Sequence, residues 1–216
     1  YSTKLEILEG KTRILVNQAF GWNINQPFLY GSAVYTIFDD GNLSVEFDYT
    51  ATRKLTFLPR IGLRLFLDKN FSNVNYFGYG PGESYADKHQ ACYIGKFSSK
   101  VEDMFEPYIK PQENSSHYDC RYVSICDAET KLTFTGKKIQ ELGKEDGIRH
   151  ISFNASEYTQ EELFTKRHNF ELEKSGFSIL CVDYQMAGVG SNSCGPALAQ
   201  KYRIQLPKIK GKICMK

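Results

Sequence analysis

Residues 39–49 contain the pattern that decides the fold class, and they read Asp-Asp-Gly-Asn-Leu-Ser-Val-Glu-Phe-Asp-Tyr. The first four residues are of the types that form tight hairpin turns. In the seven that follow, every second residue is apolar, and alternate residues of a β-strand lie on the same face. These apolar positions are Leu43, Val45, Phe47 and Tyr49. The segment therefore predicts a turn followed by a strand with one buried face.

The same alternation recurs along most of the chain, most clearly at residues 61–67, Ile-Gly-Leu-Arg-Leu-Phe-Leu. Many short strands separated by glycine-rich turns are typical of an antiparallel β-sandwich. We therefore expect an all-β protein with a large antiparallel sandwich. Further candidate strands are residues 12–18, 29–38, 120–125, 131–135, 149–154, 169–173, 177–183 and 201–206.

One short helix is expected within the sandwich. Residues 159–162, Thr-Gln-Glu-Glu, match a capping box with Thr159 as the N-cap and Glu162 three residues later. The helix should end near residues 166–168, Lys-Arg-His, where positive charge suits a helix C-terminus. The polar and charged residues 127–147 predict a protruding hairpin or a mobile loop.

Composition excludes several classes of protein. The 216 residues include 27 basic and 25 acidic side chains, a net charge of +2, which gives no electrostatic reason to expect nucleic acid or a membrane surface. No apolar run approaches the ~20 residues that a spanning helix needs. No secretion signal is visible, and the six cysteines lack zinc-site spacing, so we expect reduced thiols in a cytoplasmic protein. The start at Tyr1 rather than Met favours a fragment of a longer polypeptide.

Five motifs follow one another from the middle of the chain. Residues 75–87 combine glycines, a proline, aromatic residues and two carboxylates, which predicts a shaped loop at the end of a strand. The other motifs are Leu-Pro-Arg-Ile-Gly at 58–62, Asp-Met-Phe-Glu-Pro-Tyr at 103–108 with Pro-Gln-Glu-Asn at 111–114, Phe-Asn-Ala-Ser at 153–156, and Ala-Gly-Val-Gly-Ser-Asn-Ser-Cys-Gly-Pro at 187–196.

In this order, the motifs resemble the C-terminal domain of the large β-galactosidases of glycoside hydrolase family two. The resemblance covers roughly residues 58–206, whereas residues 1–57 match only in their strand pattern. It implies a sandwich of the galactose mutarotase-like supersandwich type. Residues 1–216 would form one such domain that lacks its N-terminal part.

The resemblance also implies a function for the parent enzyme, which would hydrolyse terminal β-D-galactosides such as lactose. In the family, both catalytic glutamates and the magnesium ligands lie in a separate (β/α)₈ barrel. This chain would then hold no catalytic residue and no metal or cofactor, although the parent would use magnesium and sodium. Its partners would be the barrel domain or a large subunit, together with the galactoside, and neither nucleic acid nor membrane.

The candidate site is the loop at residues 188–196, which in the family forms part of the active-site wall. The resemblance implies that Asn192, Ser193, Cys194 and Gly195 line the leaving-group side. Bacterial members commonly carry a tryptophan where this chain has Cys194, and a thiol cannot stack on a sugar ring as an indole does. The alternative is that Cys194 is merely a small buried residue.

Several other residues could have either a catalytic or sugar-binding role or a purely structural one. Glycoside hydrolysis uses two carboxylates, so a pair among the carboxylates of the loop motifs could be catalytic, or these groups could hold turns and arginines. Cys194 could be a nucleophile with His168 or His150 as its base. Trp22 could stack on a sugar or lie at a sheet edge. The aromatic residues of 75–87 could form a carbohydrate platform or belong to the core. The carboxylates are Glu83, Asp87, Asp103 and Glu113, and the aromatic residues are Tyr76, Phe77, Tyr79 and Tyr85.

Three other functions remain open beside a non-catalytic domain of a larger enzyme. The chain could be a stand-alone carbohydrate-binding module, the small subunit of a heterodimeric β-galactosidase, or a purely structural interaction domain.

Overall fold

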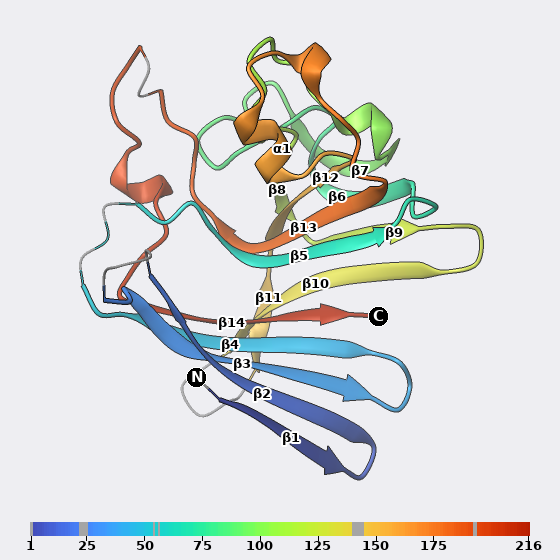
Figure 1. Cartoon of the computed structure of the whole chain (residues 1–216), viewed down its shortest axis with the longest axis vertical. Helices are drawn as coiled ribbons and strands as arrows, with labels where there is room; N and C mark the ends of the chain where they lie inside the picture. The colour runs from blue at the N-terminus through green and yellow to red at the C-terminus, as the bar shows by residue number, and fades with distance from the viewer. Residues whose placement is uncertain (1, 22–25, 54, 56, 140–144, 192–193) are drawn as a thin grey trace.

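Two antiparallel β-sheets face each other in the computed structural model, which describes residues 2–21, 26–53, 55, 57–139, 145–191 and 194–216 (Figure 1). The large sheet has ten strands and the small sheet has four. In spatial order the large sheet contains β1 (Thr3–Leu8), β2 (Lys11–Phe20), β3 (Leu29–Phe38), β4 (Leu43–Ala51), β14 (Lys208–Met215), β10 (Lys131–Ile139), β9 (Tyr122–Cys126), β6 (Asn73–Gly80) and β7 (Tyr93–Lys100), and β11 (Glu145–Arg149) also pairs with β10. The small sheet contains β5 (Arg60–Asp68), β13 (Phe177–Met186), β12 (Ile151–Ser156) and β8 (His117–Cys120). The predicted all-β sandwich is confirmed.

The core lies between the two sheets, because each contributes an apolar face. Val45, Phe47 and Tyr49 of β4 are buried, which confirms the face predicted from their spacing. From the small sheet, Phe153 and Val182 are fully buried in the same cluster as Phe47 and Tyr49. The alternate apolar residues of β5 also pack on this cluster, and they are Ile61, Leu63, Leu65 and Leu67.

The predicted hairpin turn is present between β3 and β4. Gly41 has a φ of +83°, which a glycine adopts without strain. The backbone N–H of Asn42 donates to Oδ1 of Asp40 at 3.0 Å. The turn therefore has the residues that its backbone geometry needs.

Among the described residues one α-helix is present, α1 (Gln160–Thr165), and it begins as predicted and ends directly before Lys166. Thr159 is the N-cap, and its Oγ1 accepts the N–H of Glu162 at 3.0 Å. The last turn itself holds no basic residue, but Lys166, the first of the predicted basic residues, is the C-cap, and its backbone N–H donates to the carbonyl oxygen of Glu162. Three short 3₁₀ helices complete the described helical segments: η1 (Glu102–Met104), η2 (Asn169–Glu171) and η3 (Gln200–Tyr202).

Two predicted strands were wrong. Residues 169–173 begin with η2, where Phe170 is 81% exposed, so the apolar alternation has no second layer to pack against. Residues 201–206 overlap η3, and the strand in this region is β14, which begins at Lys208. Alternating apolar residues predict a strand only where another element covers the apolar face.

Residues 75–87 are not wholly a loop, which corrects the prediction for this motif. Residues 75–80 belong to β6, which lies between β7 and β9. Glycine is needed inside this strand because a Cβ on Gly78 would lie 2.3 Å from the Sγ of Cys120. Only residues 81–87 lie beyond the strand, and close packing explains why a strand interior is rich in glycine.

The four aromatic residues of this motif differ in burial, and three of them, Tyr76, Phe77 and Tyr79, belong to β6. Tyr76 and Tyr85 are buried in the core, as the core interpretation predicted. Phe77 and Tyr79 are half-buried, and Arg121 lies over the ring of Phe77 at 4.2 Å. The core interpretation is therefore correct for two of the four.

Residues 127–147 include all of β10 and the start of β11, which pair antiparallel. The expected hairpin is thus present in the described residues. No helix among the described residues is long and apolar enough to cross a membrane.

Candidate functional site

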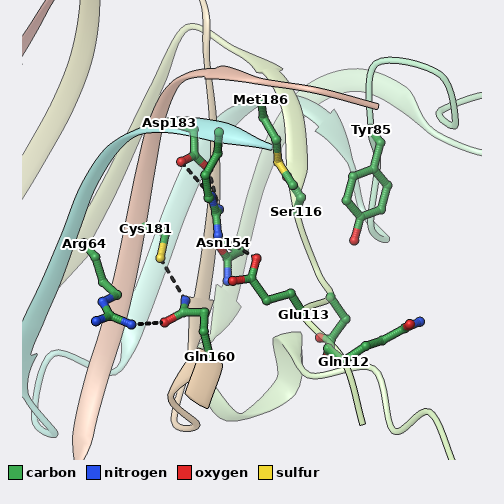
Figure 2. A network of polar contacts seen from close by, with 12 residues as sticks. Arg64, Tyr85, Gln112, Glu113, Ser116, Asn154, Gln160, Cys181, Asp183 and Met186 are labelled. Atoms are coloured by element: carbon green, nitrogen blue, oxygen red, sulfur yellow. Dashed lines mark hydrogen bonds and ion pairs between the residues drawn. The ribbon is translucent and has the colours of Figure 1, made fainter. Parts of the chain in front are cut away.

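Three of the sequence motifs meet at one arginine at the start of β5. Arg60 donates from Nε and Nη2 to the two carboxylate oxygens of Asp183, at 2.9 and 2.5 Å. Its Nη2 also donates to Oδ1 of Asn154 at 2.9 Å, and its Nη1 to Glu113 at 2.7 Å. Figure 2 shows Asp183, Asn154 and Glu113 around this centre. The guanidinium thus joins β5, β12, β13 and the segment before β8.

The positive charge of Arg60 compensates for the burial of the Asp183 carboxylate. Asp183 is 2% exposed, and burial raises the pKa of its carboxyl, which the Arg60 guanidinium opposes through attraction and hydrogen bonds. Burial alone would lower the pKa of Arg60, but Asp183 outweighs it and raises that pKa. A two-pronged contact between a guanidinium and a carboxylate is among the strongest hydrogen-bonded pairs in proteins. The cluster therefore fixes the position of residue 183, four residues before the 187–196 loop begins.

A shorter polar chain runs beside this cluster on the small sheet. Arg64 donates from Nη1 to Oε1 of Gln160 at 2.8 Å, and Gln160 donates to the Sγ of Cys181 at 3.1 Å (Figure 2). Burial raises the pKa of the Cys181 thiol to about 12, so the thiol stays protonated at neutral pH. This chain ties the first turn of α1 to the sheet.

Glu83 joins the loop after β6 to the 103–108 motif and to the backbone at Ser115. Its Oε1 accepts from the hydroxyl of Tyr108 and from Nζ of Lys88, the latter at 2.9 Å. Its Oε2 accepts from the hydroxyl of Tyr85 at 3.1 Å and from the backbone N–H of Ser115 at 3.0 Å. Burial would raise the pKa of Glu83, but the hydrogen bonds from Tyr108 and Lys88 prevail and lower it. The carboxylate therefore stays ionised and holds three segments together.

Asp87 anchors the loop that contains Cys194. Its two oxygens accept the backbone N–H groups of Val189 and Gly190, at 3.0 and 2.8 Å. Glycine is needed at 188 because a Cβ there would lie 2.4 Å from Oδ1 of Asp87. Glycine also suits position 190, where φ is +68°. The glycines of this motif thus let the backbone approach a carboxylate.

Beyond this anchor, the loop projects from the body of the molecule, at the upper left of Figure 1. The N–H groups of Cys194 and Gly195 donate to the carbonyl oxygen of Ser191, at 3.1 and 2.5 Å. The side chain of Cys194 is exposed, so the alternative of a buried cysteine is wrong for this chain. Asn192 and Ser193, the other two residues of the predicted wall, lie outside the described residues.

Comparison with known proteins agrees with this arrangement of motifs. The family described as "Beta galactosidase small chain" matches residues 5–215. The chain belongs to this family. The match includes most of residues 1–57, for which the sequence analysis found only a strand pattern.

Relatives of this small-chain domain are named beta-galactosidases. The chain is 43% identical over 176 residues to the protein of Actinobacillus pleuropneumoniae, covering 82% of this chain and 16% of that protein. It is 35% identical over 201 residues to the protein of Staphylococcus xylosus, covering 92% and 19%. It is 33% identical over 183 residues to the protein of Kluyveromyces lactis, covering 82% and 17%. The chain therefore spans less than a fifth of the length of these relatives.

Within the small-chain domain, the carboxylates of the motifs have structural partners. Glu83, Asp87 and Glu113 hold backbone N–H groups, hydroxyls, a lysine or an arginine, as the turn-holding interpretation predicted. Asp103 differs, because it is exposed in the first turn of η1. The described residues contain no group of three or more His, Cys, Asp or Glu side chains that could hold a metal ion.

The histidines considered as bases for Cys194 each contact a carboxylate. His150 Nδ1 lies 2.8 Å from Asp119 Oδ1, and His168 Nδ1 lies 3.2 Å from Glu171 Oε1. These contacts give both histidines a structural role. Trp22, considered for sugar stacking, lies outside the described residues.

The sequence analysis missed Asp183, which is the most buried carboxylate of the cluster. A signal was present, because residues 179–184 read Ile-Leu-Cys-Val-Asp-Tyr and place one charge in an apolar strand. A carboxylate in such a strand needs a cation beside it. The Arg60 of the Pro-Arg-Ile-Gly motif supplies that cation.

A cavity of about 550 Å³ opens beside the Arg60 cluster, between β2 to β4 and β5. Phe20, Phe47 and Tyr49 line its large-sheet side. Arg64 and Glu113 line the opposite side. The cavity thus combines apolar rings with charged groups.

The loop anchor leads to a prediction about Asp87. Replacing Asp87 with Ala removes both acceptors of the Val189 and Gly190 N–H groups, at a cost of about 1–2 kcal/mol to the local structure. We expect the exchange of these two amide protons with solvent to become roughly tenfold faster or more, measured by NMR. Asp103→Ala serves as the control, because that side chain is exposed and should leave both rates unchanged. Unchanged rates in Asp87→Ala would show that the anchor does not order the loop.

Proposed function

We propose that the chain works as the non-catalytic C-terminal domain of a β-galactosidase. In that enzyme it covers a separate catalytic barrel and supplies one wall of the leaving-group site. The carrying observation is the 187–196 loop, which Asp87 holds at its base and which presents the exposed Cys194 beyond the body of the domain. Gly195 lies beside the thiol on the same turn, and Asn192 and Ser193 precede it.

The chemistry of the parent enzyme follows from this assignment. It would hydrolyse terminal β-D-galactosides such as lactose with two carboxyl groups, one as acid and one as nucleophile. Those groups, and the sites for magnesium and sodium, would belong to the remaining four-fifths or so of a protein like the relatives above. That part is either the rest of one polypeptide or a separate large subunit. Six thiols without disulfides fit a cytoplasmic enzyme.

The wall role is tested by Cys194→Trp in the complete enzyme. An indole at this position would stack on the sugar in the leaving-group site and add about 1 kcal/mol, or roughly fivefold tighter binding of free glucose as acceptor. The measurement is the dependence of galactosyl transfer on glucose concentration. Hydrolysis of a chromogenic galactoside reports whether the variant enzyme is intact.

Cys194→Ser is the matched control, because it keeps the size of the side chain and adds no ring. It should leave glucose binding close to that of the original enzyme. The wall role is wrong if Cys194→Trp hydrolyses the chromogenic substrate normally and binds glucose with unchanged affinity.

A second candidate function is a galactoside-binding module, favoured by the cavity beside Arg60. Aromatic rings opposite polar groups are a common lining for sugars. Calorimetric titration of the 216-residue chain with lactose separates the two functions. A domain that only forms a wall of the active site in the parent enzyme should show no saturable heat of binding. A galactoside-binding module should show a saturable heat of binding.

A further inference from the structure

Two points at which the chain passes from one sheet to the other lie side by side. The chain leaves β8 in the small sheet and enters β9 in the large sheet through Arg121. It returns from β11 in the large sheet to β12 in the small sheet through His150. Because β8 pairs with β12, with Ile151 opposite Cys120, the two crossings are neighbours at one corner of the sandwich.

The backbone at this corner is held in an unusual conformation. Asp119 has a φ of +56°, in the left-handed region that, after glycine, Asn and Asp adopt most readily. Its carboxylate joins the two crossings, because Oδ1 lies 2.8 Å from Nδ1 of His150. Such conformations persist only where the surroundings enforce them, and they are concentrated at functional sites.

Gly136 allows β10 and β11 to lie close together at this corner. Gly136 of β10 pairs with Arg149 of β11, and a Cβ at 136 would lie 2.6 Å from the carbonyl oxygen of Arg149. Because position 136 is a glycine, β11 can lie close to β10 at Arg149, directly before the chain passes to the small sheet at His150. This approach fixes the backbone from which the Arg149 side chain extends.

These elements surround a cavity of about 270 Å³, which we name the corner pocket. Its charged lining residues are Asp119, Lys138, Arg149 and His150, and Tyr118 and Tyr184 supply aromatic walls. Two side chains with a permanent positive charge thus face one carboxylate, which already contacts His150. The pocket carries an excess of about one positive charge when His150 is neutral.

Arg149 is the group in the pocket whose hydrogen bonding is incomplete. Its Nε is buried and has no hydrogen-bond partner in the structure. Its guanidinium lies over the ring of Tyr184, 5.6 Å from the centroid. Burial raises the pKa of Tyr118 and Tyr184, and the positive charge of Arg149 opposes both shifts. Arg149 is half-buried and lines the pocket, so an acceptor that enters the pocket can meet its guanidinium, while the covered Nε–H is left without a protein partner.

We propose that the corner pocket binds a carboxylate group, with Arg149 as its main partner and Lys138 as a second positive charge. The planar fork of a guanidinium matches the two oxygens of a carboxylate. The small charge excess suits a singly charged group better than a dianionic phosphate. The volume is below the range of about 300–1,000 Å³ typical of pockets for larger ligands, so the occupant is a small acid or one side chain.

The carboxylate has two sources, a free small acid or an Asp or Glu side chain from the rest of the β-galactosidase. The site lies outside the 187–196 loop, so the free-acid source is independent of the function proposed above. The side-chain source would be a second contact between this domain and the remainder of the enzyme.

The first arm of the test uses the 216-residue chain labelled with ¹⁵N at arginine. Arg149→Lys identifies the Nε–H signal of Arg149 by its disappearance, and sodium acetate is then added while sodium chloride keeps the ionic strength constant. We expect this signal to shift in a saturable manner, while the signal of Arg13, a half-buried arginine of β2 that contacts Glu6, stays in place. Arg13→Gln is the matched control and should retain the full response at Arg149.

The second arm uses the complete enzyme and compares Arg149→Gln and Arg149→Lys with Arg13→Gln. If a side chain fills the pocket, both Arg149 variants should weaken association of this domain with the remainder roughly tenfold, as lost charge-assisted hydrogen bonds would. A saturable acetate shift with unchanged association identifies a free acid as the occupant. Weakened association identifies a side chain. The proposal is overturned if acetate moves no Arg149 signal and neither Arg149 variant changes association.

Discussion

Replacing Arg60 with Met should lower the free energy of unfolding by about 3–5 kcal/mol, because the change leaves the Asp183 carboxylate buried without its cation. Asp183 is 2% exposed, and its two oxygens accept from Arg60 at 2.9 and 2.5 Å. Asn154 and Glu113 would lose the same partner. Methionine fills most of the volume of the arginine stem, so the loss reports the charge rather than a cavity. The measurement is unfolding in urea, followed by fluorescence and circular dichroism.

The matched control for Arg60 is Arg64→Met on the same strand. Arg64 pairs with Glu161, whose side chain is 67% exposed, and exposed pairs contribute about 0–1 kcal/mol. Asp183→Asn combined with Arg60→Met should recover part of the loss, since the double variant buries no charge. Equal effects of Arg60→Met and Arg64→Met would refute the role given to the buried pair.

Acidification should destabilise the protein through His117, by about 3 kcal/mol between pH 6.5 and pH 4. Burial lowers the pKa of His117 from the ordinary 6.5 to about 4. The unfolded chain therefore takes up the proton at a higher pH than the folded chain does. The stability that this histidine contributes is fully present above pH 6.5 and is lost as the pH falls to about 4. The measurement is the free energy of unfolding across this range.

His117→Gln isolates the contribution of this histidine from the other acid-sensitive groups. The ring of His117 lies 4.5 Å from that of Tyr76 and 5.0 Å from that of Phe153, so the variant should be less stable at pH 7. Its stability should nevertheless fall less steeply between pH 6.5 and pH 4. Phe164→Ala, at a side chain that is 83% exposed and carries no titratable group, should keep the original slope. The same slope in His117→Gln and the unmodified chain would exclude His117 as the cause.

Local features of the fold could be predicted from the sequence, because the residues that determine them are neighbours. The turn at Gly41 and the cap at Thr159 depend on contacts within a few residues, and the apolar face of β4 is visible in the alternation of its own residues. The two wrong strands show where this reasoning ends. Residues 169–173 have the alternation of a strand, yet no sheet covers Phe170. A partner distant in sequence decides such cases, and the sequence pattern does not reveal it.

In the candidate site, too, the local motifs could be predicted from the sequence, whereas the contacts between distant residues could not. The motifs that contain Arg60, Glu113 and Asn154 could be recognised one by one, but their meeting point at Asp183 could not. Arg60 and Asp183 are 123 positions apart, and the pairing of β5 with β13 brings them together. The corner pocket was also missed, since it depends on two crossings between sheets that have no sequence signature.

The position of β14 has a consequence for the synthesis of this protein. β14 lies between β4 and β10, so it joins the four strands β1 to β4 to the remainder of the large sheet, although it comes last along the chain. Until residues 208–215 leave the ribosome, β4 and β10 each keep an open edge that another nascent chain could pair with. Chaperones that shield such edges should therefore matter most until β14 has been made, and a stop codon before Lys208 would leave two half-sheets with no strand to connect them.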